Sequence, residues 1–278
     1  MKRTISLFVL SVVACIAALP LVLAAPFVPV LARYSGGPVE NGGTVKGTVR
    51  LTEIPAAEAF VIAKDEKTCA HAKTSPRLVV DKETKGLGNV VVWLDDIEKG
   101  KPLPKGGPYV IDQKDCQYSP HVSVVPVDSD LSFGSSDPIL HNVHVYQSSP
   151  ENPHDMSRTV LNTAMKDNSV PNVPLGRREM RRPGFFFAKC DAGHIWMSAY
   201  IFVVEHPYYA VTDATGAFEL KDVPPGTYTL RFWHENWVAN PVMKDGSVSD
   251  YTYNAPLMHS ARVTVEAGGT ATVEWVVP

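Results

Sequence analysis

The sequence has 278 residues, of which 45% are hydrophobic and 20% charged, and its formal net charge is −3 at pH 7. This length suffices for one large domain or two modest domains with hydrophobic cores. The mildly acidic charge gives no electrostatic basis for binding nucleic acid, and the 23 Pro and 19 Gly are too few for a disordered or collagen-like chain.

The N-terminus has the pattern of an export signal. Lys2 and Arg3 form a short basic start, and an apolar stretch follows over 5–19. We therefore predict a signal peptide over 1–25. An uncleaved anchor is the alternative, because 5–32 is uncharged and long enough to span a bilayer, and only this alternative attaches the protein to a membrane. Both place the body of the protein in the periplasm or outside the cell.

The remainder of the chain predicts an all-β fold. After a flexible linker expected over 26–43, apolar and polar residues alternate in short runs separated by Gly and Pro, as in strands of a sandwich or barrel. The clearest runs are 44–51, 89–94, 121–127, 142–146, 199–205, 227–233, 261–266 and 270–277. Gly268 and Gly269 predict a hairpin turn between the last two runs.

Two stretches depart from this alternation. Residues 55–67 are the best candidate for a short helix, although Val61 and Ile62 make the choice ambiguous. Residues 148–182 contain few alternating pairs and predict a long irregular excursion, a kind of loop that is often functional.

A group of metal-binding residue types follows this excursion. Cys190, His194 and Met197 place a thiol, an imidazole and a thioether on one loop. Soft sulfur ligands favour copper, and a site of two His and one Cys with a weak axial Met describes an electron-transfer copper centre. The second imidazole must come from His141 or His144. These two lie three residues apart and face opposite sides of a regular strand, so only one can be a primary ligand.

These residues carry a resemblance to a known family. The run 121–133, with Asp137 and the His-Asn-Val sequence at 141–143, resembles the N-terminal half of a cupredoxin, and 183–197 is similar to that family's C-terminal ligand loop. The resemblance covers roughly 106–205 and implies a cupredoxin-like Greek-key β-barrel or sandwich with one mononuclear, type 1-like copper. The ligands that it implies are His141, Cys190, His194 and an axial Met197, with His144 as the alternate and Asn142 tying the ligand loops together.

The spacing of the ligand loop also occurs in the binuclear copper domain of cytochrome oxidase. That domain has a further Cys four residues before the first, where this chain has Phe186. We therefore expect a mononuclear site.

Three cysteines remain outside the predicted signal. An odd number in an oxidising compartment indicates one disulfide and one remaining thiol. Pairing Cys69 with Cys116 leaves Cys190 for copper, although this pairing rests on counting alone. Two reduced cysteines at 69 and 116 would leave the copper hypothesis unchanged.

The C-terminal part carries a second resemblance. The turn at 212–218, followed by 223–230, resembles the carboxypeptidase regulatory-like β-sandwich, which has a transthyretin-like fold. We predict this sandwich over 206–278. The β segment 44–105 belongs either to it or to the cupredoxin-like part. The resemblance implies a structural or binding unit without catalytic residues.

Three further features bear on activity and partners. His234 and Glu235 are of residue types that act as acid and base, but no supporting spacing surrounds them, so we expect packing roles and no enzyme. Trp196 is either a surface contact for electron entry or a packing residue. A basic cluster could dock an acidic redox partner such as a cytochrome, or could simply be solvated. Its members are Arg177, Arg178, Arg181 and Arg182.

Two functions remain open from the sequence. The first is an exported copper-binding, cupredoxin-like protein that transfers single electrons or handles copper in the cell envelope. The alternative is a non-catalytic β-sandwich module of the cell envelope that binds a ligand such as carbohydrate and has a vestigial metal site.

Overall fold

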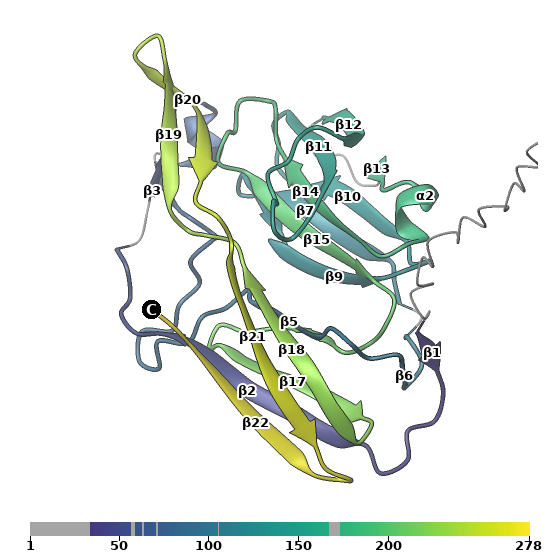
Figure 1. Ribbon diagram of the computed structural model, residues 1–278. Helices are drawn as coiled ribbons and strands as arrows, with labels where there is room; N and C mark the ends of the chain where they lie inside the picture. The colour runs from purple at the N-terminus through teal and green to yellow at the C-terminus, as the bar shows by residue number, and fades with distance from the viewer. Residues whose placement is uncertain (1–33, 57–58, 63, 71, 105, 167–172) are drawn as a thin grey trace, which may run out of the picture. The chain divides into compact units, whose positions relative to one another are not determined.

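The computed structural model describes residues 34–278, except 57–58, 63, 71, 105 and 167–172. The predicted signal peptide or anchor lies outside this part. Almost all regular structure in the described residues is β-strand, which confirms the all-β fold, and each of the eight predicted runs overlaps a strand (Figure 1). None of the described helices is long and apolar enough to cross a membrane.

The middle of the chain forms a sandwich of two sheets. One sheet contains, in order, β13 (Val173–Pro174), β10 (Leu131–Ser135), β7 (Tyr109–Lys114) and β8 (Gln117–Ser119). The other contains β12 (Thr159–Met165), β11 (His141–Ser148), β14 (Gly184–Lys189), β15 (Ser198–Val204) and β9 (Val122–Pro126). Apolar side chains from both sheets, including Ile111, Phe133 and Phe186, share one buried core.

A second sandwich is built from strands on both sides of this middle segment. One sheet contains, in order, β16 (Tyr209–Val211), β5 (Val91–Leu94), β18 (Gly226–His234) and β21 (Leu257–Val265). The other contains β17 (Ala217–Val223), β2 (Gly43–Leu51) and β22 (Thr270–Val277). Val49, Leu94 and Phe232 lie in its core. Strands β2 and β5, which precede residue 106, therefore pair with strands that follow residue 206.

The remaining elements are short. Three strand pairs are β1 (Ser35–Gly36) with β6 (Lys99–Gly100), β3 (Ala59–Val61) with β4 (Ala72–Thr74), and β19 (Ala239–Lys244) with β20 (Ser247–Tyr253). The two helices of the described residues are α1 (Glu66–Cys69) and α2 (Arg177–Met180).

Strand β14 explains how the two sandwiches contact each other. Its side chains alternate between two buried clusters, because Phe186 faces the first core whereas Phe185 and Phe187 join an aromatic cluster with Trp233 of β18. The ring centroids of Phe185 and Trp233 are 5.5 Å apart, and the Trp233 indole N–H donates to the carbonyl of Pro150 over 2.8 Å. A strand that is buried on both faces has a continuous apolar sequence, and residues 185–188 of β14 have this pattern.

Two sequence predictions of local structure are wrong. The helix expected over 55–67 is not found in the described residues before Glu66, where α1 begins; instead β3 pairs with β4, as the β-branched Val61 favours. The excursion 148–182 is not irregular throughout, because β12 pairs along β11, and α2 follows further on.

Two connections also differ from expectation. Gly268, at φ +65°, and Gly269 form a turn, but the strands on either side enter different sheets: β21 pairs with β18, and β22 with β2. Both strands then direct apolar side chains into the same core, which a hairpin would not require. The stretch 34–43, expected to be a flexible linker, is held to the body where β1 pairs with β6.

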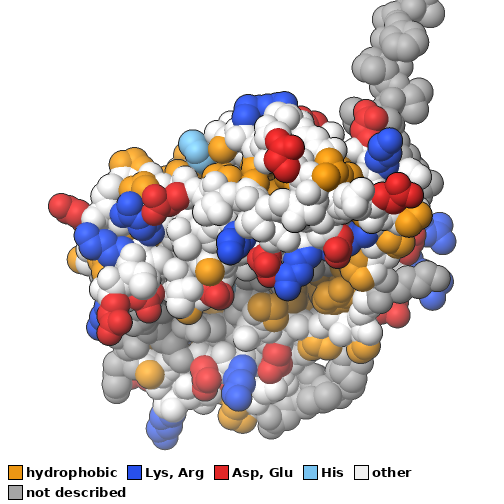
Figure 2. Space-filling model, turned by 90° about the horizontal axis from the view of Figure 1, so that it is seen from below, with side chains coloured by type: hydrophobic (Ala, Val, Ile, Leu, Met, Phe, Trp, Pro, Cys, Tyr) orange, Lys and Arg blue, Asp and Glu red, His pale blue; other side chains and the backbone are white. Residues whose placement is uncertain are grey.

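Exposed ion pairs line the second sandwich. Arg231 lies 2.6 Å from Asp95, and Arg262 lies 3.2 Å from Asp96. Such exposed pairs contribute about 0–1 kcal/mol each. On the face shown in Figure 2, acidic and basic side chains are interspersed, as expected for a chain whose opposite charges nearly balance.

A buried ion-pair network lies where the sandwiches meet. The Arg77 guanidinium is fully buried and contacts the Glu235 carboxylate, which also accepts from His121. Arg77 donates to the Ser198 hydroxyl over 3.1 Å and lies 3.4 Å from the centre of the Tyr253 ring. Burial alone would raise the pKa of Glu235, but Arg77 and His121 hold that pKa at about 2. The predicted packing role of the 233–237 segment is therefore correct, although its carboxylate is ionised.

Buried histidines predict a loss of stability in acid. Burial lowers the pKa of His154, His206 and His234 from 6.5 to about 4. Between these values the unfolded chain binds more protons than the folded chain, so the free energy of unfolding falls as the pH falls. We expect about 1 kcal/mol per pH unit for each histidine near pH 5. Urea unfolding at pH 7.5, 5.5 and 4.5 measures this, and His206→Gln should reduce the slope. A stability independent of pH over this range would contradict the assignment.

Candidate metal centre

Pairing of two strands brings the candidate ligands together. Strand β11 begins at His141, β14 ends immediately before Cys190, and the two strands are antiparallel with His144 opposite Lys189. The start of β11 therefore lies beside the end of β14. The turn after Cys190 carries His194, whose carbonyl accepts from the Met197 N–H over 3.0 Å.

Three donor atoms converge in this buried space. The Nδ1 atoms of His141 and His194 are 3.1 Å apart, and the Cys190 Sγ lies 3.9 Å and 3.6 Å from them respectively. All three residues are at most 1% exposed. Metal–nitrogen bonds of about 2.0 Å and metal–sulfur bonds of about 2.3 Å allow separations up to about 4.0 Å and about 4.3 Å between ligands of one ion. The three distances satisfy these limits, so the donor set fits a single metal ion.

Two carboxylates fix the orientation of the imidazoles. Asp137 accepts from the His141 Nε2 over 2.8 Å, and Asp65 accepts from the His194 Nε2 over 2.9 Å. With the proton on each Nε2, both Nδ1 atoms present lone pairs to the sulfur and to one another. Burial and the neighbouring His141 lower the pKa of His194, which favours its neutral form. A cation, or the thiol proton of Cys190, would satisfy these converging lone pairs.

Asp137 is itself held rigidly. Its two carboxylate oxygens accept the backbone N–H groups of Asp115 over 2.7 Å and Cys116 over 2.8 Å. It is 4% exposed, whereas the side chain of Asp65 is 33% exposed. Sequence reasoning quoted Asp137 only within the cupredoxin resemblance and missed Asp65, which lies 129 residues from His194 and has no local signal.

Asn142 joins the two ligand segments. Its backbone N–H donates to the Cys190 Sγ over 3.3 Å, and its side-chain oxygen accepts from the Asp191 N–H over 3.3 Å. Burial raises the pKa of the Cys190 thiol, while the N–H groups directed at the sulfur act against this rise. A thiol of this kind becomes a thiolate when a metal replaces its proton.

The other two proposed ligands take different positions. His144 faces away from Cys190, with its Nδ1 2.5 Å from the Asp191 carboxylate and its Nε2 2.8 Å from the Thr159 hydroxyl. The geometry thus places His141, rather than His144, in the donor set. Met197 is 2% exposed and belongs to the same buried cluster as Cys190.

Trp196 is not a surface contact. It is 2% exposed, its indole N–H donates to the Cys116 carbonyl over 3.0 Å, and its ring lies 5.4 Å from that of His194. Of the two roles considered for Trp196, the structure therefore supports packing. The side chain packs in the core against His194 and the backbone of Cys116.

Cys69 and Cys116 form the disulfide that counting indicated, with their Cα atoms 5.4 Å apart. Cys190 is the one free cysteine among the described residues, and it is buried. The division of the cysteines into one bridge and one available thiol is therefore confirmed.

The arginine cluster lies away from the donors. The four predicted arginines are exposed and, with Arg158, line a hollow of about 540 Å³. None of the five makes an ion pair with a described residue. The cluster precedes β14 whereas Cys190 follows it, so the six residues of this strand separate them by about 20 Å.

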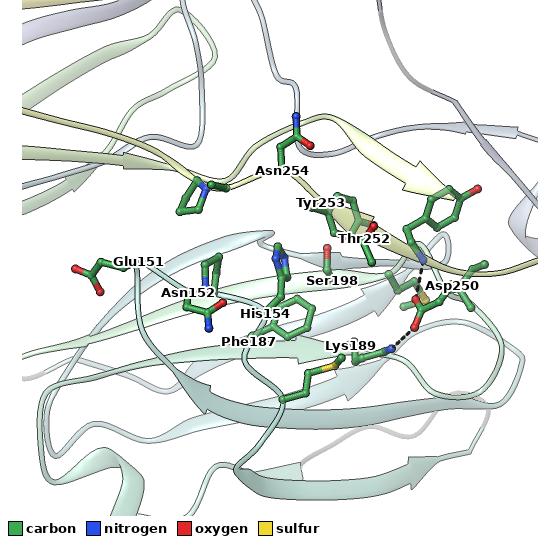
Figure 3. A pocket seen from close by; sticks show the side chains of 17 residues that line it. Glu151, Asn152, His154, Phe187, Lys189, Ser198, Asp250, Thr252, Tyr253 and Asn254 are labelled. Atoms are coloured by element: carbon green, nitrogen blue, oxygen red, sulfur yellow. Dashed lines mark hydrogen bonds and ion pairs between the residues drawn. The ribbon is translucent and has the colours of Figure 1, made fainter. Parts of the chain in front are cut away.

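A pocket of about 300 Å³ adjoins the centre on another side (Figure 3). It is lined by the loop 151–156, by the segment 250–256 and by side chains of β14 and the residues before β15, among them Met197. His154 and Phe187 point into it, and Lys189 forms a 3.2 Å ion pair with Asp250 at its wall. The pocket therefore combines aromatic and apolar side chains with charged and amide groups.

No protein-family model and no curated protein matches the sequence. Among solved structures, a reduced Cu(I) form of an amicyanin mutant is similar at 18% identity, over 36% of this chain and 86% of that chain, with a TM-score of 0.28. Auracyanin A, a "blue" copper protein from Chloroflexus aurantiacus, is similar at 14% identity, over 35% of this chain and 100% of that chain, with a TM-score of 0.27. A Cu-containing nitrite reductase from Thermus scotoductus SA-01 is similar at 16% identity, over 38% of this chain and 26% of that chain, with a TM-score of 0.29.

Proposed function

We propose that this protein is an exported, mononuclear copper-binding protein with a cupredoxin-like part, and that it transfers single electrons or handles copper in the cell envelope. The observation that carries this proposal is the convergence of two carboxylate-oriented Nδ1 atoms and one thiol in a buried space. A soft sulfur with two imidazoles is a donor set that copper prefers.

The residues of the centre have separate tasks. His141, Cys190, His194 and Met197 would hold the metal. Copper, when bound, would supply one-electron exchange between Cu(I) and Cu(II). Asp137 and Asp65 keep both imidazoles in the ligating tautomer, and the apolar core excludes water from the donors. Because no residue of this set is placed to activate a substrate, we propose no enzymatic activity.

Electron transfer suits the enclosed centre better than copper delivery. The Nε2 edge of His194 is closed by Asp65, and the neighbouring Lys64 ammonium donates to the carbonyl of Ala192. Exchange of the metal would require this contact to open. A buried, preorganised donor set favours retention of the ion through many electron transfers.

The arginine cluster is proposed to act in partner docking. Five arginines that form no ion pair with a described residue, beside the single carboxylate of Glu179, present a local positive field on an acidic chain, which would steer an acidic redox partner such as a cytochrome. Because the cluster is about 20 Å of strand from Cys190, it would accelerate encounter rather than form the electron contact. Electron exchange with an acidic cytochrome should slow as salt increases, and a rate independent of salt would contradict this role.

The second sandwich is proposed to be the carboxypeptidase regulatory-like module that its sequence resembles. Its turn residues support this, since Asp213 accepts from Thr215 and Ala217 and Gly216 has φ +78°. The alternative function, a ligand-binding envelope module, is favoured by the pocket beside β20, which is lined by Phe187, Tyr251 and Tyr253 among others.

Matched histidine variants test the copper proposal. Wild-type protein should bind one equivalent of Cu(II), and the bound copper should be reduced and reoxidised reversibly by one electron. His141→Gln should weaken copper binding at least tenfold, because it removes one of three strong ligands. His144→Gln should leave the affinity unchanged, because its side chain faces Asp191. Competition with a Cu(II) chelator measures both, and equal losses in the two variants would contradict the ligand assignment.

A further inference from the structure

The Cys69–Cys116 disulfide lies directly beside the candidate metal centre. Both of its sulfurs and a ring nitrogen of His194 lie within 4.8 Å of one another. The Cys116 sulfur also lies within 4.8 Å of a ring nitrogen of His141 and an oxygen of Asp137. Both half-cystines are fully buried. A buried disulfide thus adjoins both imidazoles of the centre.

Reduction would change the donor set of this space. A thiolate is a much stronger metal ligand than a disulfide sulfur. With the bridge open, three cysteine sulfurs and two imidazoles would share one buried region, and such soft donors select Cu(I). We propose that reduction of Cys69–Cys116 creates a second metal site for Cu(I), formed by the two thiolates of Cys69 and Cys116 beside His194, which remains a ligand of the first site. This second site goes beyond the proposed function, which needs only the first.

The chemistry balances with a dithiol as reductant. A small dithiol transfers two electrons and two protons to the protein disulfide, giving two protein thiols, and becomes a disulfide itself. Each protein thiol then releases its proton as its sulfur binds Cu(I), and the oxidation state of copper does not change. The reductant can reach the bridge where α1, whose Glu66 and Lys67 are exposed, opens locally.

Backbone contacts would keep both cysteines in place after the bridge opens. The Cys69 N–H donates to the carbonyl of Asp65 over 2.9 Å, and the carboxylate of the same residue holds His194. The Cys116 N–H donates to Asp137 over 2.8 Å, and its carbonyl accepts from Trp196 over 3.0 Å. These four contacts are independent of the S–S bond. The thiols would therefore remain beside the imidazoles.

Copper(I) stoichiometry tests this proposal. The oxidised protein and a protein reduced with dithiothreitol, then freed of reductant without air, are titrated with Cu(I) against bathocuproine disulfonate. We expect one tightly bound equivalent in the oxidised protein and two in the reduced protein. One equivalent in both forms would overturn the second site, as would loss of the β-strand circular dichroism signal on reduction.

Variants separate this proposal from the first site. Cys190→Ser should bind little Cu(I) when oxidised and one equivalent when reduced. The double variant Cys69→Ser and Cys116→Ser should bind one equivalent whether or not it is treated with dithiol. If the oxidised wild type binds none while the reduced wild type binds one, the proposed function fails and the second site stands. Reduced Cys190→Ser that binds none would overturn the second site alone.

Discussion

Replacing Glu235 with Gln is expected to lower the free energy of unfolding by about 3–5 kcal/mol. The substitution leaves the fully buried Arg77 guanidinium without its counter-charge, and the remaining contacts with Ser198 and the Tyr253 ring do not neutralise it. Urea unfolding at pH 7.5 measures the loss. Because the network joins the two sandwiches, the variant should also unfold with a broader transition if they separate.

Two controls define this result. Replacing both charges together, Arg77→Met with Glu235→Leu, should cost less than Glu235→Gln alone, because no buried charge remains unpaired. Asp96→Asn removes an exposed pair with Arg262 and should change the free energy of unfolding by no more than about 1 kcal/mol. If Glu235→Gln loses no more than Asp96→Asn, the network does not hold the junction.

Asp137→Asn should weaken copper binding by about 10–100-fold. The amide would not accept the His141 Nε2 proton as a carboxylate does, so the imidazole could place its proton on Nδ1 and lose its ligating lone pair. Asp65→Asn acts on His194 in the same way, but its side chain is one-third exposed, so water can replace the lost contact and the effect should be smaller. Competition with a Cu(II) chelator at pH 7.5 measures both affinities.

An exposed carboxylate serves as the control for these variants. Asp155 accepts from the backbone N–H of Ser157 and contacts neither histidine, so Asp155→Asn should leave copper affinity unchanged. Equal effects of Asp155→Asn and Asp137→Asn would show that net charge, rather than orientation of the imidazole, controls the binding.

Most features of the fold that could be predicted from the sequence follow from local residue patterns. Alternating apolar residues mark the strands because one face of each is buried, and this signal needs no knowledge of the partner strand. The choice of partner is not local. The turn at Gly268 and Gly269 has the chemistry of a hairpin, yet β21 and β22 enter opposite sheets, because β2 from the other end of the chain pairs with β22.

The residues of the candidate centre likewise divide into those that local sequence could predict and those that it could not. His141, Cys190 and His194 could be predicted as a group because they stand at the ends of neighbouring strands and have distinctive chemistry. Asp65 could not, since it reaches His194 across 129 residues. Arg77 could not be paired with Glu235 for the same reason, and burial at the junction of the sandwiches is what makes that pair strong.

The most direct measurement of the copper assignment is the visible absorption spectrum of the mature protein after addition of one equivalent of Cu(II). A thiolate bound to Cu(II) should give an intense charge-transfer band, and Cys190→Ser should abolish it while the fold, followed by circular dichroism, is retained. His144→Gln should keep the band. Absence of the band in the wild type, or its survival in Cys190→Ser, would contradict copper ligation by Cys190.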